Sequence, residues 1–390
     1  MQNTGIERYR FLDLYRGIIV LFMVEGHVVR ELLTPDLKAS QFFGFHEVFH
    51  GVTAPGFLFG AGFTLAVATQ RRWIQSVSLG SHFFRRVWRS IALILIGYSL
   101  HLPYLSLQKT ITVATVEEWT NLLSFDVLQC IGLGLLFIRL LLIIIKQERW
   151  FIISLIVFLL AIVYSTPFLW SHQTQYSLPI FLSAAIQGST GSPFPIFPYV
   201  GFIFAGTFIA WLFLRYSQKN KEKQFVTWLM FIGICLIGCS IILDLLPYQT
   251  YTEYRYWYTS PNFFWLRLGI LLVMLSSLWF FEELLSIKYE AGGWFPKWLT
   301  VIGIESLFMY IAHLLLLYGW VTNVEFNLRW IRSGRLNLFE SLCATVLLTL
   351  ILIPMSYLWH YIKKQHPILA KGILWWLGCS LAWSFFFNPY

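Results

Sequence analysis

The chain has 390 residues, of which 57% are hydrophobic, 19% aromatic and only 12% charged. Soluble domains carry about 25% charged residues, so this chain has too little polar surface to cover a water-soluble globule, and its apolar content also excludes disorder. A net charge of +9 could indicate nucleic-acid binding. In so apolar a chain it instead favours basic loops beside a bilayer. We expect a multi-pass protein of the cell membrane that binds no nucleic acid.

Hydropathy predicts an all-α, polytopic helical bundle. A transmembrane helix needs roughly 20 mostly apolar residues, and a scan with that window gives about eleven candidates. The predicted spans are 12–33, 49–69, 87–107, 122–145, 150–169, 195–215, 225–247, 263–284, 298–320, 339–362 and 372–387. The first apolar run lacks a small-residue cleavage site, so we interpret it as a retained span. No internal repeat is visible, which predicts a single domain over 1–390 and disfavours an inverted-repeat transporter.

Loop charge predicts that the N-terminus is cytoplasmic. The loop after the second span carries Arg71, Arg72, Arg85 and Arg86, and the loops after the sixth and tenth spans are also basic. The loops that alternate with them are neutral or slightly acidic, so the positive-inside rule places the basic loops in the cytoplasm. The loops at 285–297 and 321–338 depart from this pattern.

The first span, RFLDLYRGIIVLFMVEGHVVREL, contains more ionisable residues than a span facing lipid tolerates. At about 100° per residue, Asp13, Arg16 and His27 share one stripe, whereas Glu25 points to the opposite side. Asp13 and Arg16 are expected to form an ion pair between residues i and i+3. A direct role of both at a substrate site is the alternative.

Further polar residues fall in the outer half of the predicted bundle. They are His46, His50, His101, Asp126, Gln129 and His313. We infer a polar, water-accessible chamber there, although a membrane histidine can also bond only to a neighbouring helix, as we interpret His101. A metal site of His27, His46 and His50 is disfavoured because Glu47 is the only carboxylate expected at ligand spacing.

Glycine and proline mark two places where helices should be irregular. HGVTAPGF lies at the start of the second span and SPFPIFPYVGFIFAG at the start of the sixth. Irregular backbone at membrane depth is tolerated only beside protein or a wet cavity. Both stretches lie on the same side as the polar residues, which supports the chamber.

Several segments, in order, resemble a known family. They are RFLDLYRGIIVLFMVEGH, HGVTAPGFLFGAGFTLA, FFRRVWRSIALILIGYSLHLP, FDVLQCIGLGLL, FPIFPYVGFIFAG and IGIESLFMYIAHLLLLYG. Over about residues 8–320 the chain resembles the heparan-α-glucosaminide N-acetyltransferases and their bacterial relatives, within the broader transmembrane acyltransferase superfamily. The resemblance implies an eleven-span bundle that moves acetyl from acetyl-CoA to an amino sugar across the membrane.

The resemblance also assigns roles to residues. The essential family histidine corresponds to His46, a family asparagine of the first span corresponds to His27, and a family aspartate corresponds to Gly56 and is missing here. These departures leave the acceptor open between glucosamine and a lipid-linked or envelope glycan.

Histidine suits acyl transfer because it titrates near neutral pH. We expect His46 to act as base or transient acetyl carrier, with His27 or Asp126 orienting it. Backbone amides near Gly51–Thr53 are expected to stabilise the oxyanion.

The remaining candidate residues are expected to bind substrate. They are Asp13, Arg16, His50, Gln129, His313 and Arg267. Acetyl-CoA is expected as donor with no metal, entering either by the basic loops or near Arg267 and the Arg329–Arg335 cluster. The alternatives are a proton-coupled transporter with an outer His/Asp relay and a structural or sensory membrane protein. A homodimer is compatible with the sequence.

Overall fold

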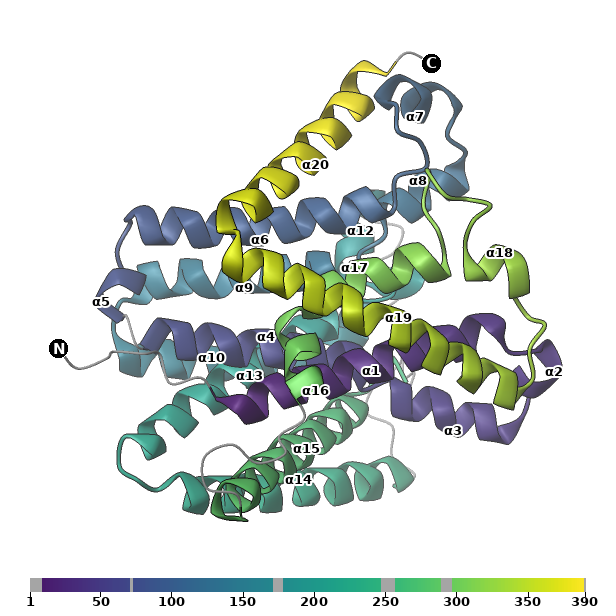
Figure 1. Ribbon diagram of the computed structural model, residues 1–390. Helices are drawn as coiled ribbons and strands as arrows, with labels where there is room; N and C mark the ends of the chain where they lie inside the picture. Colours follow the sequence, from purple (N-terminus) through teal and green to yellow (C-terminus); the bar gives the residue numbers. More distant parts are fainter. Residues whose placement is uncertain (1–8, 71–72, 171–177, 247–256, 289–296, 389–390) are drawn as a thin grey trace. The chain divides into compact units, whose positions relative to one another are not determined.

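The computed structural model describes residues 9–70, 73–170, 178–246, 257–288 and 297–388 (Figure 1). It is 83% helical. The described residues form no strand, and a lone bridge joins Leu33 to Leu336. The predicted all-α class is confirmed.

The helices belong to two compact units. The first comprises Met1–Thr53 and Met274–Ala382, and the second comprises Ala54–Val273 and Trp383–Tyr390. The first contains α1 (Arg10–Leu32), α2 (Pro35–Lys38), α3 (Gln41–His50), α16 (Lys297–Ile304), α17 (Ser306–Leu317), α18 (Leu328–Arg332) and α19 (Leu338–Gln365). The second contains α5 (Trp73–Ser76), α6 (Ser81–Leu100), α7 (Leu107–Val113), α8 (Val116–Leu123), α9 (Val127–Ile145), α10 (Glu148–Leu169), α12 (Ile180–Ile186), α13 (Ile196–Ser217) and α14 (Glu222–Leu245). Helices α4 (Thr53–Gln70), α15 (Pro261–Lys288) and α20 (Pro367–Phe387) contribute to both. The prediction of one domain stays a prediction.

Eight described helical segments are long and apolar enough to cross a membrane. They are α3 with α4, α9, α10, α13, α14, α15, α19 and α20, and the bent pair of α16 and α17 makes nine. Helices α1 and α6 coincide with the first and third predicted spans. They contain too many charged residues to be counted among the eight. Each predicted span therefore falls on a helix, while the count of eleven and the cytoplasmic N-terminus stay predictions. Arg71 and Arg72, used for orientation, lie outside the described residues.

The third and ninth predicted spans differ from the observed helices where a helix ends early and where a helix is broken. Helix α6 ends at Leu100, and His101 is its C-cap, so the span predicted to reach residue 107 stops earlier; Pro103 follows, and helices commonly end just before a proline. The span predicted over 298–320 is broken between α16 and α17, whose axes differ by 83°.

A buried carboxylate lies at the break between α16 and α17. Glu305 is 3% exposed and separates the two helices. Its oxygens accept hydrogen bonds from His360 Nδ1 at 2.9 Å and Lys363 Nζ at 2.7 Å, both from α19. Because a buried charge is costly unless paired, these contacts compensate Glu305 and fix the break against α19.

Helix α1 packs on α16 at backbone contact. A Cβ atom added to Gly303 would lie 1.9 Å from the carbonyl oxygen of Asp13, and one added to Gly17 would lie 2.3 Å from that of Leu299. Small residues permit such close approach of membrane helices.

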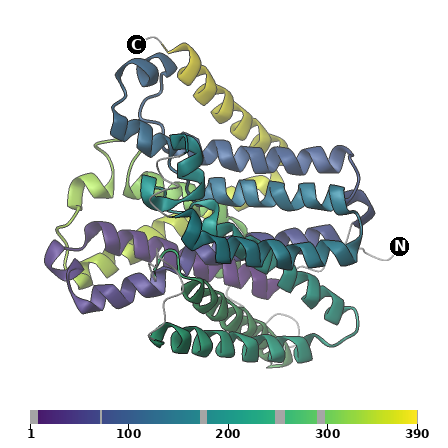
Figure 2. The same ribbon diagram turned by 180° about the vertical axis from the view of Figure 1, so that it is seen from behind.

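In the second unit, α6 and α9 lie side by side in both views (Figures 1 and 2). Helix α13 begins irregularly, with a cis peptide bond between Phe197 and Pro198 and non-helical dihedrals at Phe197. The turn between His50 and Thr53 separates α3 from α4. Both predicted irregular stretches are confirmed.

We expect Gly303→Ala to destabilise the protein by about 1–3 kcal/mol, because the added methyl group overpacks a backbone contact. Thermal unfolding of the detergent-solubilised protein would measure it. Gly378→Ala is the control, since a Cβ there meets no atom within 4 Å. Equal midpoints for the two variants would contradict the close crossing of α1 and α16.

Candidate active site

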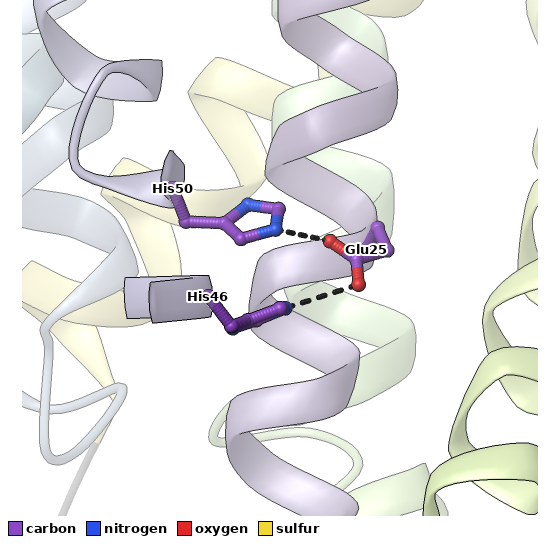
Figure 3. A group of neighbouring side chains, drawn as sticks. All are labelled: Glu25, His46 and His50. Carbon is purple, nitrogen blue, oxygen red and sulfur yellow. Dashed lines mark hydrogen bonds and ion pairs between the residues drawn. The ribbon is translucent and has the colours of Figure 1, made fainter. Parts of the chain in front are cut away.

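One carboxylate on α1 contacts two imidazoles on α3 (Figure 3). His46 Nε2 lies 3.0 Å from Glu25 Oε1, and His50 Nε2 contacts Glu25 Oε2. The two imidazole rings are 4.1 Å apart between centroids. We call Glu25, His46 and His50 the carboxylate–imidazole cluster.

The sequence of α3 explains why both imidazoles reach the same carboxylate. His46 and His50 are four residues apart and therefore lie on one face of the helix. Ser40 caps the helix by accepting a hydrogen bond from the Phe43 amide at 3.3 Å. On α1, Gly26 leaves room for His50, because a Cβ there would lie 2.5 Å from His50 Nδ1.

An ion pair holds α3 against α1 beside the cluster. Arg30 of α1 donates to Glu47 of α3 through Nε at 3.0 Å and Nη2 at 2.5 Å. This two-point contact fixes orientation as well as distance, so the imidazoles reach Glu25 in a defined geometry.

The cluster is largely enclosed, with side-chain exposures of 9% for His46, 8% for His50 and 24% for Glu25. An ionised carboxylate only accepts hydrogen bonds, so each imidazole presents its Nε2–H to Glu25. In the neutral form of each ring Nδ1 then carries the lone pair, and neither Nδ1 has a hydrogen-bond partner among the described residues. The cluster provides two oriented imidazoles, each with a nitrogen able to accept a proton.

A second histidine pair lies on α1 and α17. His313 Nδ1 is 3.0 Å from the Met309 carbonyl oxygen, and His313 Nε2 is 3.3 Å from His27 Nδ1. Since a carbonyl only accepts, a neutral His313 donates through Nδ1 and accepts through Nε2. His27 then donates through Nδ1 and keeps its lone pair on Nε2.

Asp13 and Arg16 form the expected ion pair, with Arg16 Nη2 2.5 Å from Asp13 Oδ1. The structural interpretation of these two residues is confirmed, and their role in binding substrate stays a prediction. They lie more than two helical turns before Glu25 on α1.

The other predicted site residues belong to the second unit. Asp126 caps α9 by accepting from the Val127 amide at 2.6 Å, and its Oδ2 lies 3.9 Å from His101 Nε2. Gln129 is fully buried, and its amide has no hydrogen-bond partner among the described residues. Arg267 is buried over the Phe263 ring, 3.8 Å from its centroid. The chamber that would join these groups to the histidines stays a prediction.

Glu25 was not predicted as a partner of His46 and His50. Its position opposite His27 on α1 was foreseen. The expectation that Glu47 is the only carboxylate at ligand spacing is wrong: Glu47 pairs with Arg30, and Glu25 is the carboxylate that contacts the histidines. The signal was HEVFH, in which two histidines lie on one helix face and can therefore reach a common partner.

Two of the expected oxyanion donors at the start of α4 are corrected, and the Thr53 amide stays a prediction. The amides of Gly51 and Val52 donate to the carbonyl oxygens of Glu47 and Phe49 at 2.9 and 3.4 Å. They close the end of α3, as amides and carbonyls at helix ends commonly do, and are not available to an oxyanion.

The carboxylate–imidazole cluster has a donor set that could also hold a divalent metal ion. Its ligand atoms lie within 4.8 Å of one another, and two histidines with one glutamate match the ligands of some catalytic zinc sites. HEVFH also has the His-Glu-X-X-His spacing of zinc proteases, in which the glutamate is the general base. Here Glu47 is engaged by Arg30, which does not suit that role.

Residues 8–243 match the family described as heparan-α-glucosaminide N-acetyltransferase, catalytic. The chain belongs to this family. The resemblance found in the sequence is thereby confirmed, and with its apolar helices this member of the heparan-α-glucosaminide N-acetyltransferase family is an integral membrane protein and a membrane acetyltransferase. A comparison with curated proteins found no match. The carboxylate–imidazole cluster lies within the part of the chain that matches the acetyltransferase family.

We expect metal removal to leave acetyl transfer by this heparan-α-glucosaminide N-acetyltransferase family member unchanged, because each oxygen of Glu25 already has an imidazole partner. Activity would be measured before and after dialysis against EDTA and a zinc-selective chelator. Loss of activity that Zn²⁺ restores would instead make the cluster a metal centre.

Proposed function

We propose that the protein transfers an acetyl group from acetyl-CoA to a sugar or amino-sugar acceptor on the extracytoplasmic side, with His46 as base or transient acetyl carrier. The observation that carries this proposal is the contact of His46 Nε2 with Glu25 at 3.0 Å. Because Nε2 of a neutral His46 donates to Glu25, its Nδ1 remains available to accept a proton or an acetyl group.

As a base, His46 Nδ1 takes the proton of the acceptor amine or hydroxyl while that atom attacks the thioester carbonyl. The C–S bond then breaks, and the CoA thiolate takes the proton back from the imidazolium. As a carrier, Nδ1 itself attacks the thioester carbonyl, and the C–S bond breaks to release the CoA thiolate. The acceptor amine or hydroxyl then attacks the acetyl carbonyl, the bond to Nδ1 breaks, and the acceptor's proton passes through the freed Nδ1 to the thiolate. In both routes Glu25 stabilises the positive charge that develops on the ring.

Two positioning residues complete the proposal. His27, oriented by His313 at 3.3 Å, has a lone pair on Nε2 that can hold the acceptor. Asp126, paired with His101, is proposed to orient a substrate group in the second unit.

The substrate contacts are proposed on the remaining candidates. Gln129 offers both a donor and an acceptor that are buried without a partner among the described residues; such groups are rare and need an explanation, which a bound substrate would supply. His50, His313, Asp13, Arg16 and Arg267 are proposed as further substrate-binding residues. The acceptor is proposed as glucosamine or a lipid-linked or envelope glycan in the cell membrane.

Family membership favours the transferase over the proton-coupled transporter, because the matched family is an acetyltransferase. Labelled acetyl-CoA and the purified protein test the proposal directly. Transfer of label to an added amino sugar or envelope glycan supports it, and the absence of CoA binding and transfer overturns it.

We expect His46→Ala to abolish acetyl transfer, a loss of roughly a hundredfold or more, because the group that accepts the proton or acetyl is gone. Label transfer would be measured after confirming that the variant inserts and elutes as the parent protein does. His366→Ala is the control, since His366 is exposed at the end of α19. Full activity in His46→Ala would remove His46 from the mechanism.

We expect Glu25→Gln to lower kcat by roughly tenfold to a hundredfold with little change in KM, because a neutral amide stabilises the charged imidazole less well. Glu25→Asp should recover part of the rate. Glu47→Gln, which weakens the ion pair with Arg30 and leaves the Glu25 carboxylate in place, is the comparison variant for a purely structural effect. An equal effect of Glu25→Gln and Glu47→Gln would give Glu25 a purely structural role.

A further inference from the structure

Helix α3 presents a pair of side chains that commonly chelates zinc. His46 and His50 are the two histidines of HEVFH, and their imidazoles leave the same face of a helix of 10 residues. Two histidines at positions i and i+4 of a helix are the zinc ligands of the His-Glu-X-X-His motif. Glu25 of α1 adds a carboxylate from a second helix. Two histidines and one glutamate leave the fourth position of a tetrahedral zinc ion open.

The distances within the carboxylate–imidazole cluster suit a single ion. The three ligand atoms lie within 4.8 Å of one another, and His46 Nε2 is 3.0 Å from Glu25 Oε1. Ligand atoms that lie about 2.0–2.2 Å from a tetrahedral ion are about 3.3–3.6 Å apart, so small side-chain movements make room for Zn²⁺. The ion pair of Arg30 with Glu47 holds together the two helices that supply these ligands.

The chemistry of the cluster favours Zn²⁺, bound reversibly. Imidazole is a ligand that suits zinc, whereas Mg²⁺ and Ca²⁺ take oxygen ligands. When both Nε2 atoms coordinate an ion, each Nδ1 bears the proton, and neither Nδ1 has an acceptor among the described residues. Loss of such a partner lowers metal affinity roughly tenfold to a hundredfold. We therefore expect an ion that binds and leaves, in contrast to a resident cofactor.

A bound ion would move the proton of the His46 ring. In the metal-free neutral ring, Nε2–H donates to Glu25 and Nδ1 carries the lone pair. Coordination uses the lone pair of Nε2, so the proton moves to Nδ1 and the neutral ring neither gains nor loses one. A protonated Nδ1 accepts neither a proton nor an acetyl group.

We propose that the carboxylate–imidazole cluster binds Zn²⁺ reversibly through Glu25, His46 and His50, and that the bound ion stops acetyl transfer. The zinc site stands on the contacts among these three side chains. Its inhibitory effect rests on the proposed function, in which Nδ1 of His46 accepts the proton or the acetyl group. The metal-free protein is then the active form, in agreement with the expectation that chelators leave its activity unchanged.

Titration calorimetry of the full chain in detergent with zinc chloride measures the binding. We expect about one ion per chain. Glu25→Gln and His50→Ala each remove a ligand and should weaken binding roughly tenfold or more. The matched control is Cys235→Ser combined with Cys239→Ser. These exposed cysteines have the same i, i+4 spacing on α14, and their replacement should leave the zinc affinity unchanged.

Transfer of labelled acetyl measures the effect on activity. Zn²⁺ should inhibit the parent protein over the concentration range in which it binds, and EDTA should restore the rate. The same concentration of Mg²⁺ should not inhibit. The residual transfer by Glu25→Gln should need roughly tenfold or more Zn²⁺ for the same fractional inhibition.

X-ray absorption at the zinc edge needs no variant and therefore guards against misfolding of Glu25→Gln or His50→Ala. Nitrogen and oxygen neighbours at about 2.0–2.2 Å are expected. A sulfur neighbour at about 2.3 Å would assign the ion to cysteine and overturn the inference.

Two further results overturn the zinc site and leave the proposed function standing. They are the absence of zinc binding by the parent protein and parent-like zinc affinity in both Glu25→Gln and His50→Ala. Zinc bound by the cluster with undiminished acetyl transfer would overturn the inhibition, and with it the proposed role of His46 in the mechanism.

Discussion

The Glu25 carboxylate accepts hydrogen bonds from two imidazoles of α3, and these contacts hold α3 along α1. A carboxylate in apolar surroundings is costly unless its oxygens are satisfied. His46 and His50 satisfy one oxygen each. The same contacts decide which nitrogen of each ring bears the proton, so the interaction that places the helix also sets the chemistry of the proposed base.

The sequence predicted most of the fold because its signals are local. Each predicted span falls on a helix, since a long apolar run specifies a helix in lipid without reference to its neighbours. The ion pair of Asp13 with Arg16 was foreseen for the same reason, as both residues lie on one helix. The break at Glu305 was not foreseen, because its compensating partners His360 and Lys363 are more than fifty residues away in the chain.

The candidate site was predicted in part. His46, His50, His27 and His313 were all singled out as polar residues in apolar segments. Their pairing was not, because an angular argument on α1 shows where Glu25 points but not what lies there. Arg139 was not singled out because it stands alone in the apolar run VLQCIGLGLLFIRLLLIII, and only the packing of α6 on α9 brings it to the Arg86 carbonyl oxygen and Ser90.

Buried polar groups differ in whether a neighbouring side chain or backbone group pairs with them. In the first unit, carboxylates have cationic or imidazole partners, as Glu47 has Arg30 and Glu305 has Lys363. In both units other buried atoms have no partner among the described residues, for example Arg16 Nε in the first and the Gln129 amide in the second. Buried donors and acceptors of this kind are rare in folded proteins, and for the Gln129 amide this supports the proposal that it contacts substrate.

The 83° turn between α16 and α17 sets the direction of α17. Without this turn the helix would continue in the direction of α16. The residues after Glu305 would then not run along α1. By turning there, α17 runs on beside α1, so that His313 arrives at His27 two helical turns later. Lys363 and His360, which bind Glu305, therefore help to position the His313 imidazole without contacting it.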